Sequence, residues 1–455
     1  MTCHSIKNPP QKELKMDTKT KQAEILKYLS LGLSYAFSYA YIWFFTMYTN
    51  NRIAITVFLT CLSLGAIFWL EISIRRQYLL EHFTPSRFQR AETIFWEAIL
   101  VLLSVSTLSG DMQGTSLFFI HLVVIYMVLS GTGHLLSGRS SCLIAADLAN
   151  GCFRLPFGNF FQRIPTIAGF FRSSHDTVEV VLPDGTTVAG QKVKKPAGNS
   201  LGVALVLIVI VGFFFAALNN LISVDSHFSE AAIAFDDFIA SISFSDAFGR
   251  FLISLPVGAF LFGLFHGSVR KEISKEKALH EKLLSASSKL RFVSGRILTA
   301  VLLLFSVLYL IFFISQASYM FSAFAGVLPE AFTASEYAVS GFYELINVVL
   351  INFALLATIR VFGPNESKTL RNLSVILMAE STIFSLISAS KIILYMSRFG
   401  YTFSRTLGLW GTSVVFVGSI LAIVYLLKKK QTFAPWMWYS AGSYVLTSFI
   451  TWFFI

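Results

Sequence analysis

The chain has 455 residues, of which 55% are hydrophobic and only 13% are charged, and its mean hydropathy is +0.66. Soluble domains carry about 25% charged residues, so this composition excludes a soluble globular protein and indicates a chain surrounded largely by lipid. The formal net charge of +11 does not indicate nucleic-acid binding, because the cations lie in short segments between apolar spans and form no basic stripe with stacking aromatics.

About 11 apolar segments are long enough to cross a bilayer, which takes about 20 mostly apolar residues per helix. The third is the weakest, since it is short and contains Glu97. We therefore predict an all-α, polytopic helical membrane protein with a small cytoplasmic β-hairpin insert. The predicted spans are 25–48, 53–73, 93–109, 115–136, 201–222, 248–268, 297–318, 341–361, 373–396, 406–427 and 434–455.

The distribution of Lys and Arg predicts the orientation of these spans. Cytoplasmic loops of membrane proteins carry an excess of cations, and 30 of the 36 Lys and Arg residues fall in six segments on one side. We expect the N-terminus to be cytoplasmic and, since the number of spans is odd, the C-terminus to be outside. The cation-rich segments are 1–24, 75–92, 138–199, 267–296, 360–372 and 428–430.

These features divide the chain into four regions. They are a cytoplasmic basic tail at 1–24, an N-terminal four-helix membrane region at 25–137, a cytoplasmic insert at 138–200 and a C-terminal seven-helix membrane region at 201–455. In the insert, residues 142–172 mix apolar residues with arginines, a pattern typical of short helices in the headgroup layer. Residues 177–193, around the turn Pro183-Asp184-Gly185, predict the β-hairpin.

The cytoplasmic segments also suggest what the chain contacts. The hairpin is either a connector between the two membrane regions or a docking element for a protein partner at the cytoplasmic face. Residues 269–296 alternate acidic and basic side chains and predict a charged helical extension of the sixth span with a solvated face. Membrane lipids are the other expected partners.

The sequence contains none of the common catalytic or metal-binding motifs. Its four cysteines have neither a metal-ligand spacing nor the pattern of a disulfide framework. We therefore expect a protein that is not an enzyme and that carries no cofactor and no metal ion.

Charged side chains inside the spans are the main candidates for function, because each costs about 2.5–3.5 kcal/mol at the centre of a bilayer. On the ninth span a polar stripe, interrupted by two apolar residues, covers about 80° of the helix. Ile393 and Leu386 point the opposite way, so we expect the stripe to face protein or water. Glu97 and His121 could pair across the third and fourth spans, where single polar residues usually connect helices. The stripe comprises Glu380, Ser388, Lys391 and Tyr395.

Three cations lie near the outer end of the ninth span, against the general trend: Lys391, Arg398 and Arg405. Glu336 and Glu344 lie at a similar predicted depth at the start of the eighth span. We infer an outward-facing cluster in which these carboxylates meet one or more of the cations. Two interpretations stay open: a structural ion-pair cluster that fixes the packing of spans eight to ten, or a site for a ligand or ion.

Two motifs coincide with this cluster. Residues 336–345, EYAVSGFYEL, resemble the EYAxxGFxEL signature of a bacterial family of uncharacterised multi-pass membrane proteins, domain-of-unknown-function family 4173, which has a sibling family 4153. Residues 395–402 with Arg405 resemble a second pattern of the same family: a Tyr, then Gly followed by an aromatic residue or Leu and by Thr, then an Arg. The similarity runs from about residue 200 to 430. Val339 stands where that family commonly has Arg. The resemblance implies a location in the bacterial cytoplasmic (plasma) membrane and implies no activity.

The functional prediction is a non-enzymatic membrane protein that binds a small solute, ion or lipid headgroup between spans eight and ten, for transport or sensing. The carboxylates would act as acceptors, the three cations would hold anionic groups, and Glu380 would carry a proton. The alternatives are an accessory or scaffold subunit acting through the hairpin and the basic loops, and a lipid-modifying enzyme using Glu344 and Glu380. The predicted binding residues are Glu336, Tyr337, Glu344, Glu380, Ser388, Lys391, Tyr395, Arg398 and Arg405.

Overall fold

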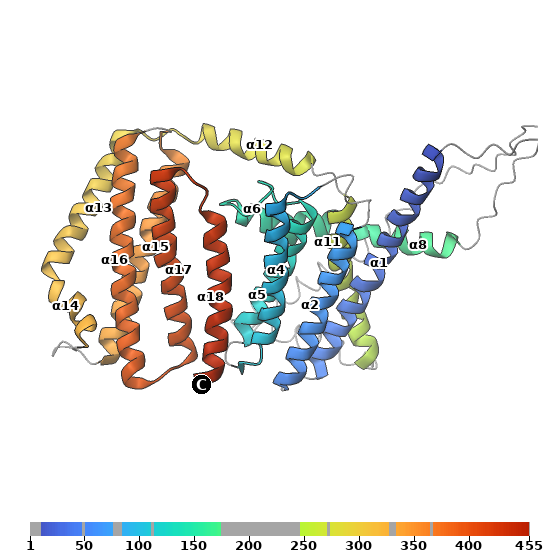
Figure 1. The fold of residues 1–455 in the computed structure, drawn as a ribbon, viewed down its shortest axis with the longest axis horizontal. Coiled ribbons are helices and arrows are strands. Elements are labelled where there is room, and N and C mark those ends of the chain that lie inside the picture. Colours follow the sequence, from blue (N-terminus) through green and yellow to red (C-terminus); the bar gives the residue numbers. More distant parts are fainter. Residues whose placement is uncertain are drawn as a thin grey trace, which may run out of the picture. The chain divides into compact units, whose positions relative to one another are not determined.

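The computed structural model consists mainly of helices (Figure 1), and the chain divides into two compact units. The first unit comprises residues 1–49, 72–81 and 150–271, and the second comprises 50–71, 82–149 and 272–455. The structure describes residues 11–47, 51–75, 84–110, 113–173, 246–270, 274–326, 334–364 and 367–454.

In the first unit a long N-terminal helix packs along α11, and a series of short helices lies against α11 as well. The elements are α1 (Gln11–Met47), η2 (Asn150–Arg154), α7 (Leu155–Gly158), η3 (Phe160–Gln162), α8 (Arg163–Ser173) and α11 (Asp246–Arg270). Close packing depends on Gly258, where a Cβ atom would collide with Ser38 and Arg163. The buried Arg163 donates a hydrogen bond to the Leu255 carbonyl (3.0 Å) and lies 4.9 Å from the ring centre of Tyr35.

The second unit is built around α16, which packs against α13, α15 and α17. The helix α17 contacts α18, which in turn contacts α4, and α4 packs on α5. The elements are α2 (Arg52–Arg75), α4 (Arg87–Ser106), α5 (Gln113–Thr132), α6 (Ile144–Ala149), α12 (Ser274–Lys289), α13 (Gly295–Ser315), α14 (Ala317–Phe321), η4 (Ser322–Ala325), α15 (Ala334–Phe362), α16 (Lys368–Phe399), α17 (Phe403–Lys428) and α18 (Phe433–Phe454).

The ends of these helices follow from local sequence. Ser86 begins α4 in a capping box with Gln89, in which each side chain bonds the other residue's backbone N–H. Ser367 caps α16, where its Oγ accepts a hydrogen bond from the Leu370 N–H (3.2 Å). The same helix stops at Gly400, whose φ of 78° lies in the region that glycine adopts without a steric penalty.

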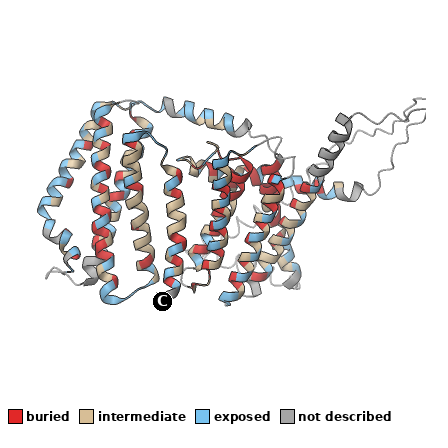
Figure 2. Ribbon diagram, in the orientation of Figure 1, coloured by how far each residue is buried: buried red, intermediate tan, exposed pale blue. Residues whose placement is uncertain are grey.

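The core of the second unit lies between α13, α15 and α16, and α16 is buried along the side that faces its neighbours (Figure 2). The Phe384 ring stacks on Phe313 (4.7 Å between ring centres) and meets Tyr309 edge-on (5.1 Å). The outer side of α13 remains apolar, and Leu304 is 68% exposed. A face of this kind is suited to lipid contact.

The structure confirms the all-helical prediction for the described part of the chain. Seven described helices are long and apolar enough to cross a membrane: α2, α5, α11, α13, α15, α16 and α17. Ten predicted spans coincide with described helices, whereas the fifth, 201–222, and the hairpin at 177–193 lie outside the described residues. No strand occurs in the described part of the chain.

The segments predicted to be cytoplasmic agree with the sequence in part. Between residues 144 and 173 the chain forms a series of short helices, as the alternation of apolar residues with arginine and proline predicts. The charged segment 269–296 contains α12, which is helical as predicted. Residues 271–273, which would join it to α11, are outside the described part.

Candidate functional site

Lys391 on α16 is a fully buried cation, with 0% of its surface exposed. Gly341 on α15 makes room for it, because a Cβ atom at that position would collide with the Lys391 Nζ atom. Glu344, less than one helical turn further along α15, is exposed and interacts electrostatically with Lys391. The sequence motif that contains Gly341 and Glu344 therefore surrounds a buried ammonium group.

The polar stripe of α16 faces protein, as predicted. Ser388, about one turn before Lys391, is fully buried, and its Oγ has no hydrogen-bond partner among the described residues. Ile393 and Leu386, which were predicted to point away, are 54% and 45% exposed. We call Gly341, Glu344, Ser388 and Lys391 the Lys391 site.

Arg398 and Arg405 bond backbone carbonyls near the end of α16. Arg405 Nη1 donates to the carbonyl oxygens of Phe399 (3.0 Å) and Gly400 (2.8 Å). Arg398 Nη2 donates to the carbonyl of Gly326 (3.1 Å). Arginines placed in this way hydrogen-bond carbonyls that have no partner within the helix. Their positive charge also interacts favourably with the negative end of the helix dipole.

Of the remaining predicted residues, the structure describes the side chain of Tyr395. Tyr395 is half-buried on α16, and the guanidinium carbon of Arg405 lies 4.1 Å from the centre of its ring. Glu336 and Tyr337 lie on α15, but their side chains are not among those that the structure describes.

Glu380 belongs to a different part of α16. It lies eleven residues before Lys391, about 16 Å along the helix axis. Its Oε2 atom accepts a weak hydrogen bond from Ser306 of α13 (3.5 Å). The structure therefore brings Lys391, Ser388 and Glu344 together and leaves Glu380 apart from them.

A polar network between α13, α15 and α16 was missed by the sequence reasoning. Tyr309 donates to Asn352 Oδ1 (2.7 Å), and Asn352 Nδ2 donates to Ser381 Oγ (2.9 Å). All three residues are buried. A search restricted to ionisable residues overlooks Asn352, although an amide within an apolar span is itself a signal of contact between helices.

A second network joins α4 to the segment that follows α5. Glu92 accepts hydrogen bonds from the backbone N–H (3.0 Å) and the hydroxyl of Ser140, and Tyr126 donates to the same hydroxyl (2.9 Å). Asp147 on α6 accepts the Leu136 N–H at 2.7 Å. Burial, with the nearby Glu92 charge, raises the pKa of Asp147 to about 6 despite this hydrogen bond.

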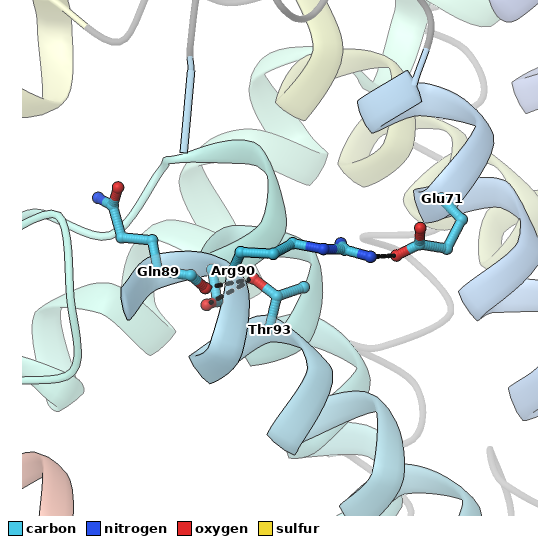
Figure 3. Close-up of polar contacts among 5 residues, drawn as sticks. Glu71, Gln89, Arg90 and Thr93 are labelled. Carbon is cyan, nitrogen blue, oxygen red and sulfur yellow. Dashed lines mark hydrogen bonds and ion pairs between the residues drawn. The ribbon is translucent and has the colours of Figure 1, made fainter. Parts of the chain in front are cut away.

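The helices α2 and α4 are joined by an ion pair, in which Arg90 reaches across to Glu71 with 2.6 Å between nitrogen and oxygen (Figure 3). Glu97, one of the charged residues of the predicted spans, interacts with both of these groups. His121 lies on an exposed part of α5, where its Nδ1 atom is 2.6 Å from the Leu117 carbonyl oxygen. The structure thus places Glu97 in a carboxylate–arginine cluster between α2 and α4.

No group of three or more His, Cys, Asp or Glu side chains suited to a metal ion occurs among the described residues. The comparisons with curated proteins and with solved structures give no match. A family model described as a domain of unknown function, DUF4153, matches residues 97–454. This is the sibling of the family whose motifs the sequence resembles, and the match begins about 100 residues earlier than expected, so it includes the third and fourth predicted spans. The chain belongs to the DUF4153 family of membrane proteins.

Proposed function

We propose that this membrane protein binds a small anionic solute at the Lys391 site, for transport across the membrane or for sensing at its surface. The observation that carries the proposal is the complete burial of Lys391 against Gly341. A charged group inside a membrane is costly and usually marks a pair, a cavity or a site. Here the glycine lets the Lys391 ammonium group lie against α15, where an alanine side chain would collide with it.

Glu344 acts in this proposal as a counterion that the ligand replaces. Lys391 is enclosed, whereas Glu344 is exposed on the neighbouring helix, so an anion approaching Lys391 competes with this carboxylate. The buried Ser388 hydroxyl would donate a hydrogen bond to the incoming anion. Enclosed polar sites between packed helices are typical of transporters, in which one group of helices moves relative to another to expose them.

The other predicted residues take supporting roles. Arg398 and Arg405 hydrogen-bond backbone carbonyls near the end of α16, and they stay candidates for holding anionic groups of the ligand. Glu380, facing α13, is a separate candidate for carrying a proton. The alternative role as an accessory subunit acting through residues 173–199 concerns a segment outside the described part and stays a prediction.

The competition between Glu344 and the ligand gives the first test. Purified protein in detergent is heated with increasing inorganic phosphate or succinate, and the rise in unfolding temperature is measured. Glu344→Gln should respond at lower anion concentration than the wild type, by about tenfold, because the competing carboxylate is gone. Lys391→Met should not respond. If Glu344→Gln only lowers the folded yield and neither protein responds to an anion, the pair is a structural ion-pair cluster and the proposal is wrong.

Access to the site gives the second test. In a chain whose four cysteines are replaced by serine, Ser388→Cys is treated with a small charged thiol reagent. Ser385→Cys is the matched control, since Ser385 is equally buried on the same helix and its hydroxyl bonds the Ser381 carbonyl. We expect labelling at 388 and little at 385. No labelling at 388 from either side of the membrane would show that the site never opens to water.

A further inference from the structure

A cavity of about 400 Å³ lies in the second unit where α15 ends, α16 begins and α17 ends. Its size falls within the range of small-ligand sites. Its lining includes five cations and, among the described residues, no acidic side chain; Glu366, between α15 and α16 in the sequence, is outside the described residues. We call this cavity the basic pocket, and its cations are Arg291, Arg360, Lys368, Arg371 and Lys429.

The described contacts of these cations do not neutralise them. Arg291 donates to the Gly363 carbonyl at a long 3.4 Å, and Arg360 lies over the Tyr425 ring at 4.5 Å. The Nε atom of Arg371 is buried without a hydrogen-bond partner among the described residues. Five like charges around one cavity repel each other, and a bound anion would remove that repulsion.

The backbone at the pocket also favours an anion. Lys368 is the first residue of α16, and Ser367 caps that helix at the pocket wall. The N-terminus of a helix presents unpaired N–H groups and the positive end of the helix dipole. This feature adds to the five side chains, and phosphate oxygens accept hydrogen bonds from backbone N–H, ammonium and guanidinium groups alike.

Part of the pocket wall is apolar. Ile359, Leu370 and Leu426 line it, and the three helices that form it are among those long and apolar enough to cross the membrane. The pocket lies at the ends of these helices, which places it, in a chain that spans the membrane, where lipid headgroups meet water on the face predicted to be cytoplasmic. Basic pockets between transmembrane helices at this face are suited to anionic headgroups.

We propose that the basic pocket binds a phosphate-bearing anion, either the headgroup of an anionic phospholipid or a soluble phosphate ester. The site is distinct from the Lys391 site, and the proposal does not depend on the function of that site. A lipid would place its phosphate among the cations and its glycerol and first methylene groups against the apolar wall.

The test uses full-length protein, stripped of lipid in a neutral detergent, and measures the shift in unfolding temperature. Three probes are added in turn: phosphatidylglycerol, phosphatidylcholine and glycerol 1-phosphate. Stabilisation by phosphatidylglycerol alone identifies a lipid, and stabilisation by glycerol 1-phosphate identifies a soluble phosphate; either outcome supports the proposal. No response to either anionic probe, or an equal response to phosphatidylcholine, overturns it.

Matched variants locate the binding. Lys368→Gln with Arg371→Gln removes two charges from the pocket, and Lys428→Gln with Lys430→Gln removes two from the nearby surface. We expect about tenfold weaker binding of the effective probe for the first pair and little change for the second. Equal weakening in both pairs would reveal a diffuse surface effect and overturn the proposal.

A pair of single substitutions provides a control in case the double variants misfold. Lys429→Gln changes an exposed residue that lines the pocket, whereas Lys430→Gln changes its exposed neighbour, which does not. Only the first should weaken the response to the probe. An unchanged response in Lys429→Gln and in the Lys368 and Arg371 double variant would exclude the basic pocket as the site.

Discussion

Replacing Asp147 by Asn should make the protein more stable at neutral pH and should have no such effect in acid. Asp147 is fully buried on α6. Its Oδ1 atom accepts the Leu136 N–H, and its Oδ2 atom has no hydrogen-bond partner among the described residues. Burial is the main reason why its pKa rises from 3.8 to about 6, and the charge of Glu92 adds to the rise.

The sign of the effect follows from which state holds the proton more tightly. Because the pKa is raised in the folded protein, the folded state keeps a proton that the unfolded state loses between pH 4 and 6. The free energy of unfolding therefore falls as the pH rises through this window and levels off above it. The difference between 3.8 and about 6 corresponds to about 3 kcal/mol. Asn keeps the acceptor for Leu136 and cannot ionise, so it avoids this loss.

The assay compares unfolding temperatures of the wild type and Asp147→Asn in neutral detergent between pH 4 and 8. The gap between the two proteins should open between pH 4 and 6 and remain constant above. Glu281→Gln is the control, because Glu281 is exposed on α12. This substitution removes the same charge from a carboxylate that is not buried. A gap that stays constant from pH 4 to 8, or that widens toward acid, would refute the reasoning.

Three further substitutions test packing in both units by the same measurement. Asn352→Leu should cost about 1–2 kcal/mol, because the buried Tyr309 hydroxyl loses its acceptor whereas the Ser381 hydroxyl keeps only the Leu377 carbonyl, and adding Tyr309→Phe should recover part of that loss; no recovery would argue against the network. Ser86→Ala should cost about 0.5–2 kcal/mol through loss of the α4 cap, and an unchanged unfolding temperature would contradict this. Arg163→Lys should destabilise the first unit, because lysine does not match the planar contact of arginine with Tyr35; a neutral result would mean that charge alone suffices there.

The helical spans could be predicted because the bilayer constrains sequence so strongly. A helix that faces lipid must be apolar over about 20 residues, and this signal needs no knowledge of tertiary packing. The direction of the α16 stripe was predictable for the same reason. The preference of lipid for apolar groups acts on each residue separately. It places Ile393 and Leu386 on the exposed side of α16 and Lys391 on the side that faces protein.

The partners of the polar groups could not be predicted in this way. Charge alone places Arg398 and Arg405 with Glu344, yet their described hydrogen bonds go to backbone carbonyls. Every helix end exposes such carbonyls, and a search among side chains does not include them. Asp147 was overlooked because it lies outside the predicted spans, where carboxylates are common and give no signal. Its burial depends on the folded segment that contains Leu136, whose N–H it accepts.

The central position of α16 explains why one helix carries both candidate sites. A polar or charged group is stable in a membrane only if other protein surfaces surround it, and α16 packs against α13, α15 and α17. A peripheral helix such as α13, with an open apolar side, has fewer places for polar groups. The distance between Lys368 and Lys391 along the helix is about 34 Å, close to the thickness of the hydrocarbon core, which is about 30 Å. In the proposed arrangement the basic pocket and the Lys391 site lie near opposite membrane surfaces, and any movement of α16 as a rigid rod would change both at once.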